Sequence, residues 1–330
     1  MHLPSISPNI QQLMNSMKQI SIIASALFLL TGFGAYSDEV GLDRPKNTRD
    51  TIPAKKLFGA KKTAARLPPK AIGFYTKGCL AGAAQLPATG TAWQAMRLDR
   101  NRNWGHPKLV ELVKRLAVEA KALDGWNGLL VGDMSQPRGG PMLTGHASHQ
   151  IGLDADVWLT PMPNKILTRK ERASISATLM VLDRKRINPK RWTNAHNRLI
   201  RRAASYSDVQ RIFVHPPIKK ALCDWSRGQS DRSWLRKVRA YYGHNYHFHI
   251  RMRCPPGVSG CRAQAEPRPK DGTGCGTELA HWFSDKPWVR PKPSPRFIDG
   301  IPLPRKKPKR KKPKTLANLP AMCRTVLTAQ

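Results

Sequence analysis

Six cysteines constrain the fold of this chain more than any other feature of its sequence. They are Cys79, Cys223, Cys254, Cys261, Cys275 and Cys323. In an exported protein, an even number of cysteines indicates disulfides, here three, and sequence alone does not choose among the pairings. Cys254 and Cys261 enclose a tight Pro-Pro-Gly loop, which makes them plausible partners. The rival interpretation is zinc binding by cysteines, and it is disfavoured because the chain has no C-x-x-C pair.

An apolar block near the N-terminus indicates export. Residues 20–34 are apolar, follow Lys18 and are preceded by no acidic residue. This is the pattern of a secretory signal peptide. Small residues at Ala35 and Ser37 place the cleavage after Ser37, so we expect residues 1–37 to be removed; an uncleaved membrane anchor is the alternative. No other apolar run approaches the ~20 residues of a membrane span, so we expect no stable span after cleavage.

The chain is strongly basic, with 57 Lys and Arg against 21 Asp and Glu and a formal net charge of +36. Such an excess favours an anionic partner or environment. Hydrophobic residues make up 40 % of the chain, enough for a sizeable core, so disorder throughout is excluded. Eight of the ten residues 305–314 are basic. We interpret this run as a solvated segment that binds something anionic; a solubilising tail without a partner is the alternative.

Composition divides the mature chain into three parts. Residues 38–70 are polar, basic and contain proline, which predicts a loose lead-in. Residues 71–290 hold the periodic segments of one folded domain, and residues 291–330 form a Pro-, Lys- and Arg-rich C-terminal segment. Cys323 lies in that last segment, so a disulfide could tie the chain end to the core.

Helical and strand patterns follow one another irregularly within the domain. Apolar residues at helical spacing after Pro107 predict a helix that ends before Gly125. A capping box formed by Thr168 and Glu171 precedes a second helix, and a third is predicted over 230–242. Strands are predicted over 128–132, 154–159, 210–214 and 247–252. Without a regular βαβ repeat, the pattern favours an α+β fold, a small antiparallel sheet flanked by helices and stapled by disulfides.

Two short segments hold five of the ten histidines. In the segment from His244 to His249, a strand would project alternate side chains from opposite faces. His247 and His249 would then share one face, while Phe248 and Ile250 point to the core. Two neighbouring imidazoles suit a metal ligand beside a proton-transfer group.

The other segment, 145–156, adds a carboxylate. Six residues separate His149 from Asp156, Gly152 permits a turn between them, and Asp156 lies in the following strand. One His, one Asp and one distal His provide three N/O ligands, which leaves a tetrahedral zinc one open position for water. The pattern therefore predicts a catalytic zinc carried by the sheet; a structural metal site or a chance grouping is the alternative.

Several other polar residues are candidates for the same site. Asp154 would share the strand face of Asp156, where it could orient a ligand histidine, bind a substrate amine or remain a solvated loop carboxylate. His106 could line the cleft or cap the helix that follows it. Asp133 and Arg138 precede a glycine-rich loop and could contact substrate charges.

These residues resemble a known family. His149-x6-Asp156 with the distal His247-x-His249 resembles the lysostaphin and D-Ala-D-Ala metallopeptidase superfamily. A more specific resemblance is to the penicillin-insensitive murein endopeptidases. Four segments carry it, in order along the chain: 100–107 (RNRNWGHP), 132–134 (GDM), 145–156 (GHASHQIGLDAD) and 243–249 (GHNYHFH). The resemblance covers roughly residues 70–280 and leaves out the basic run.

The resemblance implies a role for each site residue. The zinc ligands would be His149, Asp156 and His249. His247 would be the general base or electrostatic partner beside the metal, and His146 and His244 match further family histidines near the site. Some relatives hold a second metal with the histidine at the position of His146, across a subunit contact, which would make this protein a homodimer. The family also supports three disulfides, with Cys254–Cys261 as the local one.

The implied substrate is cross-linked peptidoglycan in the periplasm, cut at the amide between D-alanine and meso-diaminopimelate by a metal-activated water. A D,D-carboxypeptidase or dipeptidase acting on cell-wall peptides is the nearest alternative, because it would share the metal and the fold. An alternative of a different class is a basic periplasmic protein that binds anionic wall polymers or lipopolysaccharide through residues 305–314. Nucleic acid is not an expected partner, because an exported chain rarely meets it.

Overall fold

The computed structural model describes residues 51–257, 259–289, 297–298, 301–302 and 312–330. The expected signal peptide, residues 1–37, lies outside these ranges, as do residues 305–311 of the basic run. None of the helices within the described ranges is long and apolar enough to cross a membrane.

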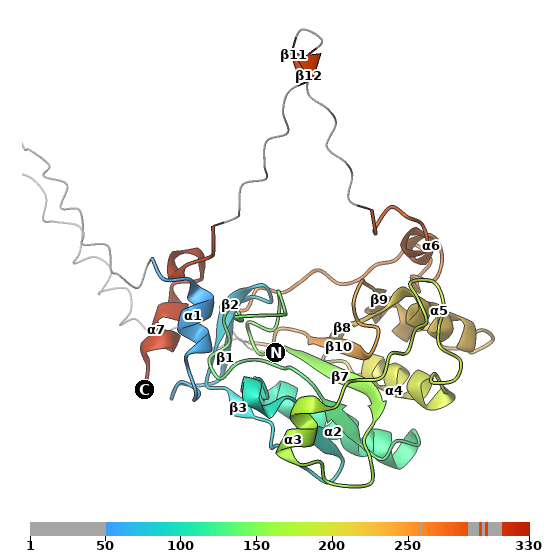
Figure 1. The fold of residues 1–330 in the computed structure, drawn as a ribbon, viewed down its shortest axis with the longest axis horizontal. Coiled ribbons are helices and arrows are strands. Elements are labelled where there is room, and N and C mark those ends of the chain that lie inside the picture. The colour runs from blue at the N-terminus through green and yellow to red at the C-terminus, as the bar shows by residue number, and fades with distance from the viewer. Residues whose placement is uncertain (1–50, 258, 290–296, 299–300, 303–311) are drawn as a thin grey trace, which may run out of the picture. The chain divides into compact units, whose positions relative to one another are not determined.

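A six-stranded mixed sheet carries the fold (Figure 1). Its strands, in spatial order, are β4 (Trp93–Ala95), β6 (Leu129–Val131), β7 (Asp154–Pro161), β10 (His247–Met252), β8 (Val209–Val214) and β9 (Val238–Ala240). The four inner strands pair antiparallel, whereas β4 and β9 join the edges in parallel. The α+β class and the expected strands at β6, β7, β8 and β10 are confirmed. The sheet is larger than predicted, and its edges are not antiparallel.

Helix α2 (Pro107–Leu123) forms where the apolar spacing predicts it. Nδ1 of His106 accepts a hydrogen bond from the backbone N–H of Lys108 at 3.3 Å, so His106 caps the helix rather than lining a cleft. Pro107 occupies the first helical position, where its missing N–H costs nothing. The face turned to the sheet buries Leu109, Val110, Leu112, Val113, Leu116, Ala117 and Ala120. Gly125, with a φ of 77°, follows the end of the helix.

The other elements are shorter. The helices are α1 (Ala54–Gly59), α3 (Arg169–Ser174), α4 (Asn194–Ser205), α5 (Pro216–Trp225), α6 (Thr277–Phe283) and α7 (Met322–Thr328). Three further strand pairs are β1 (Lys70–Phe74) with β2 (Lys77–Ala81), β3 (Ala84–Gln85) with β5 (Trp104–Gly105), and β11 (Phe297–Ile298) with β12 (Ile301–Pro302). The predicted capping box of Thr168 and Glu171 is present at the start of α3.

The helix predicted over 230–242 is wrong. The chain forms a short 3-10 helix, Ser233–Lys237, and then enters strand β9. Val238 and its neighbours pair in parallel with β8, so they satisfy the backbone groups at the edge of the sheet, which a helix would leave unpaired. Trp234 and Leu235 of the 3-10 helix are buried in the main core. Tertiary pairing therefore overrides the local helical pattern.

A second, smaller core joins the two ends of the described chain. Phe58 of α1 and Val326 of α7 are fully buried in it, together with Ile72 of the β1–β2 hairpin. Figure 1 shows α7 beside α1, and the backbone N–H of Ala54 donates to the carbonyl of Lys314 at 2.8 Å. The prediction of a loose lead-in is therefore wrong for the described part of residues 38–70, because α1 buries its apolar side chains against the C-terminal helix.

Arg138 fastens α7 to the domain. Its Nη1 donates to the carbonyls of Val326, Leu327 and Ala329 at 2.9, 2.9 and 2.5 Å, and its Nε donates to the carbonyl of Thr63 at 3.1 Å. Carbonyls in the last turn of a helix lack intrahelical partners, and this guanidinium supplies donors for them. The interpretation of Arg138 as a substrate contact is wrong, because its side chain is buried against the C-terminal helix.

The six cysteines form three disulfides, as predicted. The pairs are Cys79–Cys323, Cys223–Cys275 and Cys254–Cys261. The last of these is the local pair that the sequence suggests. Cys79–Cys323 joins α7 to β2 across a sequence separation of 244 residues. Because it closes such a long loop, it lowers the conformational entropy of the unfolded chain and so stabilises the folded state.

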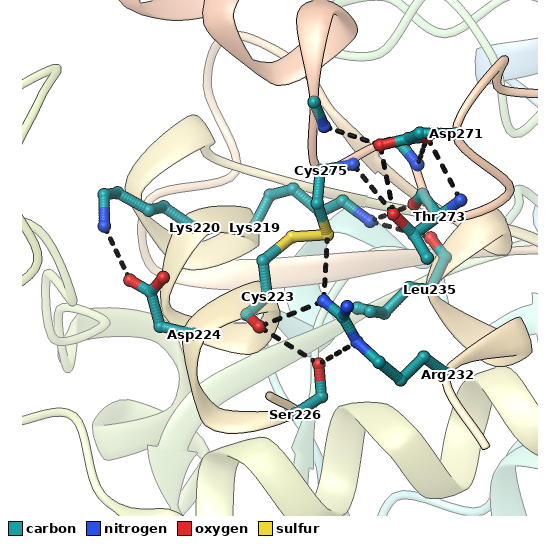
Figure 2. Close-up of a disulfide and its surroundings, with 12 residues drawn as sticks. Lys219, Lys220, Cys223, Asp224, Ser226, Arg232, Leu235, Asp271, Thr273 and Cys275 are labelled. Atoms are coloured by element: carbon teal, nitrogen blue, oxygen red, sulfur yellow. Dashed lines mark hydrogen bonds and ion pairs between the residues drawn. A yellow bond between two sulfur atoms is a disulfide. The ribbon is translucent and has the colours of Figure 1, made fainter. Parts of the chain in front are cut away.

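A buried lysine lies beside the Cys223–Cys275 disulfide (Figure 2). Nζ of Lys219, in α5, donates to the carbonyls of Leu235 and Thr273 at 2.7 and 2.8 Å. Burial lowers the pKa of Lys219 to about 7, and the positive charge of Arg239 adds to the effect. In the unfolded chain the ordinary pKa of 10.5 returns. Between these two pKa values the unfolded state binds more protons than the folded state, so stability rises with pH there.

We therefore expect the free energy of unfolding of the wild type to rise from about pH 7 to about pH 9 relative to that of Lys219→Met. The gain has an upper limit of about 1.4 kcal/mol per pH unit. Denaturant unfolding at three pH values measures it. Lys220→Met, at an exposed position of the same helix, is the matched control and should follow the wild type. A constant difference between wild type and Lys219→Met would contradict the assignment.

Candidate metal centre

Two neighbouring strands bring the second histidine segment against the first. In the antiparallel pair of β10 with β7, His249 lies opposite Asp156 and Arg251 lies opposite Asp154. Residues directly opposite one another project from the same face of a sheet. Phe248 and Ile250 are fully buried on the other face, as the alternation predicts.

His149 reaches this face from the loop before β7. Its backbone has a φ of 66°, and Gly152 follows with a φ of 69°. A Cβ at Gly152 would lie 2.4 Å from the side chain of Leu80 and 2.9 Å from the backbone nitrogen of His106, so only glycine fits. Nδ1 of His149 donates to the carbonyl of Met134 at 2.6 Å, because a carbonyl can only accept. Nε2 is thereby left as the free acceptor nitrogen of this imidazole.

Three imidazoles converge on one carboxylate oxygen. Oδ1 of Asp156 lies 3.2 Å from Nδ1 of His249, 3.6 Å from Nε2 of His149 and 3.6 Å from Nε2 of His247. Within the described part of the chain, Nε2 of His149 and Oδ1 of Asp156 are buried and make no hydrogen bond. Buried polar atoms without partners are rare in folded proteins. These atoms have the chemistry and the proximity of metal ligands.

A second grouping shares two of these residues. His146, His149 and Asp156 each offer one ligand atom, and the three atoms lie within 4.8 Å of one another. The structure thus brings together all the ligands that the resemblance implies, and it places His146 at their edge. Nδ1 of His146 lies 3.6 Å from the second oxygen of Asp156.

Asp154 holds two of the candidate ligands, His149 and His249, in position. Its carboxylate is fully buried and accepts from the backbone N–H of His149 at 2.9 Å, from Nε2 of His249 at 2.9 Å and from Nε of Arg251 at 2.8 Å. Burial alone would raise the pKa of Asp154, but the charges of Arg251 and His249 hold it well below its ordinary value. The alternative of a solvated loop carboxylate is therefore wrong, and so is contact with a substrate amine.

His249 lies between the two carboxylates. Burial would lower its pKa, but Asp154 and Asp156 raise it to about 9. Two buried carboxylates require nearby positive charge, and in this arrangement the imidazolium supplies it. A bound cation would supply the same compensation.

Asp133 links His146 to two arginines. Its Oδ2 accepts from Arg102 at 2.9 Å and from Arg100 at 3.1 Å, and it lies 3.1 Å from Nε2 of His146. Burial would raise the pKa of Asp133, but His146 and the two arginines hold it at about 2. Burial would lower the pKa of His146, but the hydrogen bond to Asp133 and the charge of Asp156 raise it. Asp133 is therefore an ionised carboxylate whose charge is compensated by its neighbours, and it holds His146 in place.

His247 and His244 stand side by side, with ring centroids 4.9 Å apart. His247 is buried, which lowers its pKa, and its Nδ1 has no hydrogen-bond partner in the described chain. Nδ1 of His244 is 2.9 Å from the carbonyl of Tyr242. Burial, followed by the charge of His249, lowers the pKa of His244 to about 3. Both imidazoles are therefore uncharged near neutral pH.

A cavity of about 320 Å³ opens beside these residues. Its lining includes Asp133, His146, Asp156, His247, Arg97 and Arg100. Sequence reasoning assigned no role to the two arginines. Arg97 lies in no recognisable motif, and although Arg100 belongs to a segment that resembles the family, nothing in its spacing says that it faces the metal site.

Comparison with known sequences identifies the family of this chain. The profile of the penicillin-insensitive murein endopeptidases matches residues 71–328. The protein of that name from Haemophilus influenzae is 46 % identical over 214 residues, which cover 64 % of this chain and 72 % of the relative. Those from Pectobacterium atrosepticum and Klebsiella pneumoniae are 42 % and 43 % identical, covering 66 % and 65 % of this chain and 76 % of each relative. The chain therefore belongs to the penicillin-insensitive murein endopeptidase family and is an enzyme of the peptidase class.

Proposed function

We propose that this protein is a zinc-dependent murein endopeptidase of the periplasm that hydrolyses the amide between D-alanine and meso-diaminopimelate in cross-linked peptidoglycan. Family membership supports the reaction class, and the names of the relatives supply the polymer. Peptidoglycan is rich in carboxylates, and a formal charge of +36 favours association with such a polymer.

The observation that carries the proposal is the pair of orphaned atoms at the centre. Nε2 of His149 and Oδ1 of Asp156 are buried without hydrogen bonds in the described chain, and Nδ1 of His249 lies 3.2 Å from that oxygen. Two imidazole nitrogens and a carboxylate oxygen are a common ligand set of catalytic zinc. When bound, zinc lowers the pKa of a coordinated water towards ~7 and polarises the scissile carbonyl.

The chain's own residues hold the ligand histidines in the required tautomers. The carbonyl of Met134 accepts from Nδ1 of His149, which turns Nε2 towards Asp156. The carboxylate of Asp154 accepts from Nε2 of His249, which turns Nδ1 towards Asp156. Such outer partners fix ring orientation and raise the basicity of the ligand.

His247 is the residue proposed for proton transfer. It lines the cavity, lies 3.6 Å from Asp156 through Nε2, and keeps an unpartnered Nδ1. As general base it would accept the proton of the attacking water and return it to the leaving amine. His146, held by Asp133 at the cavity wall, is proposed as the ligand of a second metal.

Substitution Asp154→Asn should weaken zinc binding without unfolding the domain. The amide keeps the shape of the side chain but removes the charge that orients His249, and loss of such an outer partner typically costs about 10- to 100-fold in metal affinity. Competition with a chelator, followed by metal analysis, measures the affinity. Asp99→Asn, at an exposed carboxylate, is the matched control. Equal affinities of Asp154→Asn and wild type would contradict the proposed role.

The reaction itself is tested on purified cross-linked muropeptide dimers. The mature protein should convert dimers to monomers by cleavage between D-alanine and diaminopimelate, and a zinc chelator or His249→Ala should abolish the conversion. His281→Ala, at an exposed histidine of α6, should retain it. Mass spectrometry of the products decides. Release of terminal D-alanine alone would identify a carboxypeptidase, and intact dimers with zinc-loaded protein would favour a binding role.

A further inference from the structure

Part of the wall of the cavity beside the metal residues is positively charged. Arg97 and Arg100 both line it, from the turn that follows strand β4. The same cavity is lined by Asp156 and His247. A molecule bound there would therefore meet the metal centre and the two guanidinium groups at once.

Independent contacts hold each arginine close to the centre. Nη1 of Arg100 donates to Oδ2 of Asp133 at 3.1 Å, and that oxygen lies 3.1 Å from His146. The guanidinium of Arg97 lies over the ring of Trp158, 5.5 Å from its centroid, and Trp158 is the strand partner of His247. Each arginine is thus connected to a residue of the metal centre, Arg100 to His146 through Asp133 and Arg97 to His247 through Trp158.

The turn that carries them is fixed by the fold. Arg97 and Asn101 have φ values of 56° and 51°, in the left-handed region that non-glycine residues rarely adopt. The backbone N–H of Arg97 donates to the carbonyl of Arg172 at 3.1 Å, and Oδ1 of Asn101 accepts from Nε1 of Trp104 at 2.8 Å. The conformation is therefore held by contacts outside the turn, which is how strained backbone persists at functional positions.

The local charge is not balanced by the protein. Asp133 is shared by Arg100, the buried Arg102 and His146. Arg97 donates through Nη2 to the carbonyl of Ile175 and, among the residues that the structure describes, has no carboxylate partner. Half of the Arg100 side chain is exposed. A carboxylate entering the cavity would supply the missing charge and accept from these donors.

The proposed substrate carries such a carboxylate at the required place. In the cross-link, the nitrogen of the scissile amide is attached to a diaminopimelate carbon that also bears a free carboxyl group. The carboxylate is one carbon from the bond to be cut, so its receptor must lie in the same cavity as the metal residues. Ala177 and Leu179 line that cavity as well and offer apolar contact to the methylene chain.

We propose that Arg97 and Arg100 form a subsite for the free carboxylate of the diaminopimelyl residue on the leaving side of the scissile bond, an inference that rests on the proposed function. The enzyme would thereby distinguish cross-links with a free carboxylate from those in which this group is an amide. An amide carries no charge, and its nitrogen would face the guanidinium donors.

Two synthetic cross-linked peptides test the subsite, identical except that this carboxyl group is free in one and a primary amide in the other. Wild type should show a kcat/KM about tenfold or more higher for the free acid, as expected for a charge-assisted hydrogen bond. In Arg97→Gln and Arg100→Gln, kcat/KM should fall more for the acid than for the amide, so that the ratio approaches one. Arg227→Gln, at an exposed arginine two residues beyond the end of α5, is the control and should keep the wild-type ratio.

Zinc content and thermal unfolding of each variant exclude loss of the metal or of the fold, and the two arginine variants provide separate tests if one of them is unstable. Equal rates of wild type on both peptides, or an unchanged ratio in both arginine variants, would overturn the subsite and leave the endopeptidase proposal standing. Failure of wild-type, zinc-loaded protein to cut either peptide would overturn the proposed function and the subsite with it.

Discussion

The buried carboxylate of Asp154 is the contact on which the rest of the centre depends. It binds the backbone of the loop that delivers His149, the ring of His249 on β10 and the guanidinium of Arg251 two residues further along that strand. One side chain thus fixes a loop and a strand relative to β7. Without it, the loop that carries His149 and the ring of His249 would lose the side chain that joins them.

The fold supports this contact in layers. The antiparallel register of β7 with β10 places Asp156 opposite His249, and the fully buried Phe248 and Ile250 anchor the reverse face of β10 in the main core. In the second, smaller core, the Cys79–Cys323 disulfide and the buried Arg138 hold α7 against the β1–β2 hairpin and α1. The hairpin also contacts the site loop, because Leu80 packs where Gly152 leaves room.

Sequence reasoning finds the centre because its signals are local. Strand alternation alone predicts that His247 and His249 share a face, and the spacing of His149 and Asp156 around Gly152 predicts a turn into a strand. It fails where partners are distant in sequence. Strand β9 forms because it pairs with β8, and α1 packs its apolar side chains against α7. Arg138 donates to the carbonyl of Val326 in α7, 188 residues away. Arg97 belongs to the same class, since only the folded chain shows that it shares a cavity with His247.

We propose that one metal lies between His149, Asp156 and His249. Anomalous X-ray diffraction at the zinc absorption edge, from crystals of the zinc-loaded protein, tests it most directly. We expect a dominant peak at about 2.0–2.2 Å from Nε2 of His149, an oxygen of Asp156 and Nδ1 of His249. A dominant peak held by His146 without His249, or no peak in this cavity, would contradict it.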